Sequence, residues 1–186
     1  MSGHLAFGLL FALPAWLRWN DRRSVGFVIL AVVASLVPDI DLWLVAAFPN
    51  QVHHHGVTHT VLFVTSASVV GAAIVAGVFT DQLDEWVGTE RLNRRQVFLS
   101  SFLAFFAGGL SHVFADMLSA PDISTPDIST PIEPLWPLVD GSWGIDLVWY
   151  NNWWINFGFF AAMVVAHVVA AYALTPPERR RRLSPF

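Results

Sequence analysis

The run VGFVILAVVASLVPDIDLWLVAAF, residues 25–48, decides the class of fold. Its only charged side chains are Asp39 and Asp41, and a helix needs about 20 mostly apolar residues to cross a bilayer. The run therefore predicts a membrane-spanning helix. Pro38 stands directly before the two carboxylates and has no backbone N–H, so we expect the helix to break there, near one membrane face.

Three further segments meet the same standard. The chain is 55% hydrophobic and only 13% charged, whereas charged residues make up about a quarter of a soluble domain. We therefore predict an all-α integral membrane protein with about four transmembrane helices, a short N-terminal helix and a long extracytoplasmic loop. The predicted spans are Val25–Phe48, Thr60–Phe79, Val97–Leu118 and Trp153–Leu174, and the short element, which contains Pro14, is Leu5–Leu17.

The arginines predict the orientation in the membrane. All ten basic residues are arginine, and they form clusters at residues 18–23, 91–95 and 179–182. Four spans and a short first element place the three clusters on one side, which the positive-inside rule makes cytoplasmic. Residues 1–175 then form a single membrane-embedded domain with a loop insertion at 119–152. Residues 176–186 form a basic cytoplasmic tail of a multi-pass protein of the inner or plasma membrane.

The net charge and the cysteine count exclude several kinds of partner and site. The net charge is −4, and the short basic clusters form no stripe, which argues against a nucleic-acid partner. The absence of cysteine excludes disulfides and thiolate metal sites.

Histidines and aspartates gather at the predicted outer ends of the spans. The stretch VHHHGVTHT, residues 52–60, holds four of the seven histidines between two apolar runs. His112 and Asp116 have an i, i+4 spacing near the outer end of their span, so both face one side of the helix. Gly56 permits a tight turn, so His54 or His55 can meet His59 across it. If Gly56 has the positive φ that only glycine adopts cheaply, Gly56→Val should lose the metal.

These residue types indicate a metal site. Imidazole nitrogens and carboxylate oxygens suit zinc, manganese or iron. There are more candidate ligands than the three or four that one catalytic zinc uses, which favours two ions.

The competing interpretation of each histidine is structural. A single histidine at a helix end is usually a capping or hydrogen-bonding residue, and this is our interpretation of His53. His167, midway along the last span, is also interpreted as structural, with indirect support of a metal ligand as the alternative. For the whole set a structural role is disfavoured, because ionisable residues within a membrane are rare and usually functional.

The motifs resemble those of the YdjM-type membrane-bound metal-dependent hydrolases. They occur in the family's order as GHLAFG (3–8), LVPDID (36–41), HHGVTHT (54–60), GGLSHVFADMLSAP (108–121) and PLWP (134–137). His55 stands where the family usually has arginine, and the repeated PDIST lengthens the loop after Asp116. The resemblance implies seven metal ligands: His4, Asp39, Asp41, His54, His59, His112 and Asp116.

Two functional hypotheses follow. The first is a hydrolase that uses two divalent transition-metal ions, with zinc or manganese favoured, on a phosphoester or lipid-linked substrate at the extracytoplasmic membrane face. Asp41 or His55 is its candidate general base. The alternative is a membrane transport or sensor protein that binds metal without hydrolytic activity. The expected partners are the lipid bilayer and a lipid or lipid-linked substrate, and the sequence leaves the oligomeric state undetermined.

Overall fold

The computed structural model describes residues 2–19, 21–48, 54–88, 91–120, 132–149 and 152–174. Four helical segments of this part are long and apolar enough to cross a membrane: Arg22–Ala47, Val61–Val78, Arg94–Leu118 and Trp153–Leu174. The predicted all-α class with about four spans and a short N-terminal helix is confirmed. In chain order the elements are α1 (Ser2–Ala12), α2 (Ala15–Arg18), α3 (Asp21–Ala34), the 3-10 turn η1 (Pro38–Ile40), α4 (Asp41–Ala47), the 3-10 turn η2 (Val57–His59), α5 (Val61–Val78), α6 (Thr80–Val87), α7 (Arg94–Leu118), β1 (Ser119–Ala120), β2 (Val148–Trp149) and α8 (Trp153–Leu174).

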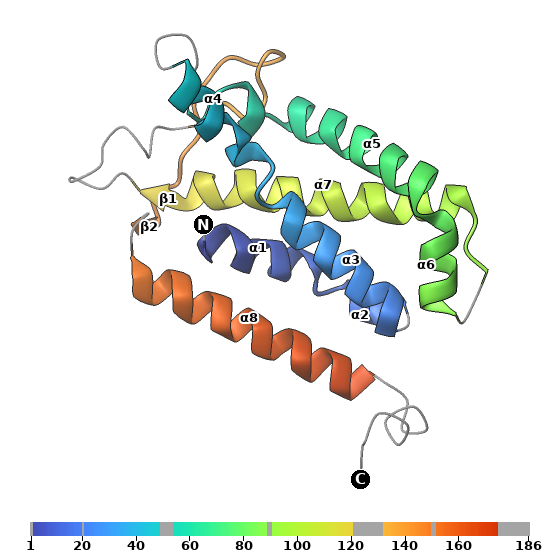
Figure 1. Ribbon diagram of the computed structural model, residues 1–186. Coiled ribbons are helices and arrows are strands. Elements are labelled where there is room, and N and C mark those ends of the chain that lie inside the picture. The colour runs from blue at the N-terminus through green and yellow to red at the C-terminus, as the bar shows by residue number, and fades with distance from the viewer. Residues whose placement is uncertain are drawn as a thin grey trace.

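Helix α7 is the centre of the bundle. It packs against α5, α3 and α1, and α8 packs against α1 (Figure 1). Two adjacent glycines allow this close approach. A Cβ at Gly108 would collide with the carbonyl oxygen of Ala31 in α3, and one at Gly109 would lie 2.6 Å from Val64 Cγ1 in α5. Small residues at such contacts let helix backbones approach closely in lipid.

The first predicted span is interrupted where its carboxylates begin. Helix α3 ends at Ala34, Pro38 opens η1, and Asp41 is the first residue of α4. Proline cannot donate the backbone hydrogen bond that would continue α3, which is the expected reason for the break. Asp39 therefore lies in a tight turn and Asp41 at the start of a new helix.

The segment 80–96, which lies between two of the predicted spans, contains a helix. Helix α6 has two turns, with Asp81, Asp84 and Glu85 among its eight residues and a buried Val87. It is too short and too polar for a span, but it has a polar and an apolar side. Helix α7 begins after it with a capping box, in which Asn93 and Gln96 each accept a hydrogen bond from the other's backbone N–H.

Residues 132–149, part of the long loop, cover one end of the bundle. Ile132 is buried against apolar side chains of α5 and α7. The backbone N–H of Val61, the first residue of α5, donates to the carbonyl oxygen of Pro134 at 2.8 Å. The strands β1 and β2 form a parallel pair that holds the loop to the end of α7.

The arginines of the described segments lie toward the other end. The Arg22 guanidinium donates to the carbonyl oxygen of Trp86 at 2.6 Å, which joins the start of α3 to α6. In Figure 1 this end is opposite the C-terminal end of α7. The basic tail falls outside the described residues.

Candidate metal centre

All seven ligands that the family resemblance implies lie together at the C-terminal end of α7. They come from four separate parts of the chain, and the turns η1 and η2 and the first residues of α1 meet at this end of α7 (Figure 1). The residues are His4 in α1, Asp39 in η1, Asp41 in α4, His54 and His59 in or before η2, and His112 and Asp116 in α7.

Three ligand atoms at the centre form a compact triangle. The two imidazole nitrogens His59 Nε2 and His112 Nε2 are 3.1 Å apart, and Asp116 Oδ2 lies 3.5 Å from the first and 3.1 Å from the second. Zinc–nitrogen and zinc–oxygen distances of about 2.0–2.2 Å correspond to edges of about 3.3–3.6 Å in a tetrahedral site. The triangle therefore has close to the size of one face of such a site. Asp39 Oδ1 is a further candidate ligand, at 3.5 Å from His112 Nε2 and 3.9 Å from His59 Nε2.

Hydrogen bonds fix which imidazole nitrogens have a lone pair at this centre. His112 Nδ1 lies 2.7 Å from the carbonyl oxygen of Ser35, an acceptor, so Nδ1 carries the proton of the neutral ring. The Thr58 hydroxyl donates to Asp41 Oδ2 at 2.9 Å, which leaves its oxygen to accept from His59 Nδ1 at 3.1 Å. Both Nε2 atoms are then acceptors that face each other.

This arrangement favours a bound cation. Both rings are fully buried, and Asp116 Oδ2 has no hydrogen-bond partner among the described residues. Three electron-rich atoms in contact and away from water are unfavourable unless a positive charge lies between them. A metal ion fits the ligand types and the spacing.

Asp41 holds the outer side of the centre. Its Oδ1 lies 3.0 Å from His54 Nδ1, and its Oδ2 accepts from the Thr58 hydroxyl and, at 3.2 Å, from the backbone N–H of His55. His59 Nδ1 is also only 3.4 Å from Oδ2. A carboxylate that holds the outer nitrogen of a ligating histidine is a common feature of metal sites. Both carboxylate oxygens of Asp41 therefore have polar partners: Oδ1 contacts His54, and Oδ2 contacts Thr58 and the backbone of His55.

The turn after the histidine run differs from our expectation. Gly56 has a φ of −82°, so it lacks the positive φ on which the expected effect of Gly56→Val depended. The left-handed residue is His55, with a φ of 65°. The backbone of His55 turns so that its N–H reaches Asp41, and histidine enters the left-handed region more readily than most side chains. The turn still brings the rings together: the His59 centroid lies 5.3 Å from that of His54 and 4.8 Å from that of His55.

His4 approaches the centre from the opposite side. Its Nε2 lies 2.8 Å from Asp116 Oδ1, and its ring stacks on that of His112 with centroids 4.0 Å apart. It therefore holds the second oxygen of the carboxylate whose Oδ2 faces His59 and His112. Its own Nδ1 is buried, with no hydrogen-bond partner among the described residues.

Two histidines stand apart from this cluster in our interpretation. His53 falls outside the described residues. His167 lies in the middle of α8, where Nδ1 accepts from the Trp16 indole N–H at 2.7 Å and Nε2 donates to the carbonyl oxygen of Leu9 at 2.8 Å. Both ring nitrogens thus serve contacts between helices, as the structural interpretation expects.

Ser35 and Thr58 were not among the predicted site residues. Ser35 acts through its backbone carbonyl, which no sequence pattern reveals. Thr58 could have been predicted from the sequence, because it directly precedes His59 within the HGVTH motif and threonine hydroxyls often form hydrogen bonds with nearby groups.

Within the described ranges, three sets of His and Asp side chains could each hold a metal ion, because the candidate ligand atoms inside each set lie within 4.8 Å of one another. The sets are His54, His55 and His59; Asp39, Asp41, His54 and His59; and His4, His112 and Asp116. The cluster as a whole has the donors for more than one ion.

Comparisons with known proteins agree with the resemblance seen in the motifs. The family model described as YdjM inner membrane protein matches residues 1–183. No curated protein and no solved structure matches the chain.

Proposed function

Because the chain belongs to the YdjM family of inner membrane proteins, and because its cluster combines imidazole lone pairs with buried carboxylates, we propose that it is a metal-dependent hydrolase. The observation that carries the proposal is the triangle of His59 Nε2, His112 Nε2 and Asp116 Oδ2, which has the ligand types and the size to hold a cation. In this proposal His59, His112, Asp116 and Asp39 hold one ion. His54 and Asp41 lie beside a second position on the more exposed side, and zinc or manganese fits both.

The ions would polarise the scissile bond and supply a nucleophilic water near neutral pH. The protein's side chains set the geometry. Asp41, through the Thr58 hydroxyl, keeps His59 in one tautomer, Ser35 does the same for His112, and His4 orients Asp116. Because both oxygens of Asp41 are engaged, we assign the general base to His55, whose ring lies at the partly exposed rim beside His54 and His59.

The proposed substrate is a phosphoester or another lipid-linked bond at the extracytoplasmic face. Support for the sidedness comes from the arginines, which lie toward the end opposite the cluster and follow the positive-inside rule. We expect a cysteine at Val57, which is 58% exposed, to react with an impermeant thiol reagent in intact cells, and one at Glu85 in α6 to react only after lysis. The reverse pattern would place the cluster in the cytoplasm.

Metal content and hydrolysis test the proposed class. We expect the purified protein to hold about two equivalents of zinc or manganese. It should hydrolyse a phosphodiester such as bis-p-nitrophenyl phosphate, or a phospholipid in nanodiscs, and a chelator should stop the reaction until metal is restored. Metal-loaded protein that hydrolyses none of these but moves the ion across a proteoliposome membrane would favour the transport alternative. Protein that binds no metal would exclude both.

A further inference from the structure

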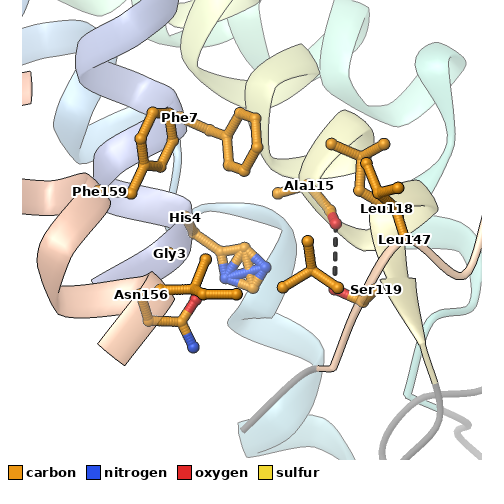
Figure 2. A pocket seen from close by; sticks show the side chains of 11 residues that line it. Gly3, His4, Phe7, Ala115, Leu118, Ser119, Leu147, Asn156 and Phe159 are labelled. Atoms are coloured by element: carbon orange, nitrogen blue, oxygen red, sulfur yellow. Dashed lines mark hydrogen bonds between the residues drawn. The ribbon is translucent and has the colours of Figure 1, made fainter. Parts of the chain in front are cut away.

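A small apolar cavity lies directly beside the metal centre. It has a volume of about 250 Å³ and is bounded by the start of α1, the end of α7, the strand β2 and the start of α8. Figure 2 shows Phe7 and Phe159 on one side of it, Leu118 and Leu147 on another, and His4 in the middle. Two larger apolar cavities, one against α6 and one along α5, are lined by none of the seven candidate ligands.

His4 belongs to both the cavity and the cluster. The same imidazole lines the cavity, bonds Asp116 Oδ1 at 2.8 Å and stacks on His112. A group bound in the cavity is therefore separated from Asp116 by a single ring. The apolar cavity and the candidate metal centre are therefore in contact through the His4 side chain.

The lining indicates what would occupy the cavity. Aromatic and aliphatic side chains dominate it, and the hydroxyl of Ser119 is already used on the carbonyl oxygen of Ala115 at 3.0 Å (Figure 2). Few polar groups remain to satisfy a sugar or a peptide, and burying unpaired polar atoms is unfavourable. A hydrocarbon chain needs no such partners.

Size and depth narrow the occupant further. Whole small-molecule ligands occupy pockets of about 300–1,000 Å³, so a cavity of about 250 Å³ suits part of a molecule. The cavity lies at the start of α8, beside the exposed Trp153 and Trp154, which are typical of the membrane interface. A lipid presents the end of its polar head and the start of its chains at this depth.

We propose that this cavity binds one hydrocarbon chain of a phosphate-bearing lipid whose phosphate lies at the metal centre. The proposal rests on the proposed hydrolase function and names its substrate class. Affinity for n-alkyl phosphates should then rise about fourfold for each added methylene until the cavity is filled. Chain length beyond that point should add no affinity through the cavity.

Residue 159 tests the proposal, because Phe159 forms one wall of the cavity. Phe159→Trp should shorten the chain length at which affinity stops rising, and Phe159→Ala should lengthen it. Phe157, two residues earlier on α8, is 58% exposed and does not line the cavity, so Phe157→Trp and Phe157→Ala are matched controls and should change nothing. The measurement is the ratio of variant to wild-type affinity across a series of n-alkyl phosphates from butyl to tetradecyl phosphate, because this ratio cancels partition into detergent.

Two readouts separate this proposal from the proposed function. Metal content and the affinity for inorganic phosphate should be the same in all four variants, since the cavity holds only the chain. An affinity ratio that does not vary with chain length in either Phe159 variant would overturn the chain site even if the protein is a hydrolase. A chain-length shift in metal-loaded protein that hydrolyses no phosphoester would support the chain site while the hydrolase proposal fails.

Discussion

His112→Ala is expected to abolish metal binding at the inner position, the one that His59, His112, Asp116 and Asp39 would hold. His112 contributes one of the three central ligand atoms, and its loss leaves His59 Nε2 and Asp116 Oδ2 without the third corner of the triangle. It also removes the ring on which His4 stacks, and with it part of the support for Asp116. Loss of an indirect partner of a metal ligand typically lowers affinity about 10–100-fold, so loss of the ligand itself should exceed about 100-fold. Competition with a chelator of known affinity measures this directly.

His167→Ala is the matched control for this prediction. It also removes a buried imidazole and two hydrogen bonds, but these bonds join α8 to Trp16 and Leu9, away from the cluster. The variant should be less stable than the wild type yet keep the full metal content. Equal metal loss in the two variants would mean that the effect is a general disruption of the bundle. Full metal content in His112→Ala would exclude the central triangle as the binding site.

The membrane architecture could be predicted from the sequence because each span is a local property. Length and hydrophobicity within one segment are enough to identify a spanning helix, and Pro38 interrupts the first span for a reason that lies in its own backbone. Helix α6 was missed for a related reason. It has only eight residues and three acidic side chains, so hydrophobicity gives no signal for it.

The set of candidate site residues was also accessible, because ionisable residues are rare in apolar runs and these cluster at one end of the spans. The individual roles of these residues could not be predicted from the sequence. His112 presents Nε2 to the centre because its Nδ1 is bonded to the carbonyl oxygen of Ser35, in the turn directly after α3. This contact needs the close approach of α3 and α7 at Gly108. The resemblance names both Asp39 and Asp41 as metal ligands. In the structure, Asp39 lies toward the central triangle, whereas Asp41 contacts His54 Nδ1 and lies near His59 Nδ1.

The second large effect is expected within the histidine run itself. If HHH were a general metal-collecting loop, alanine at His53, His54 or His55 would each weaken binding slightly and equally. The structure instead gives His54, His55 and His59 different contacts. His59 lies at the central triangle, His54 is bonded to Asp41, and His55 contributes its backbone N–H to the same carboxylate. The variants should therefore differ sharply.

His59→Ala should lose the inner ion with an effect as large as that of His112→Ala, because both remove a central ligand atom. Asp41→Asn should lower metal affinity about 10–100-fold, since the amide keeps the size of the side chain but weakens its hold on His59 and His54. His55→Arg should keep the metal, because the contact of His55 with Asp41 is made by the backbone, and it should change the rate of hydrolysis if His55 is the general base.

His53→Ala is the neighbouring control and should bind metal like the wild type. An equal, partial loss of metal across His53→Ala, His54→Ala and His55→Ala would show that the run binds ions unspecifically and that Asp41 does not order it.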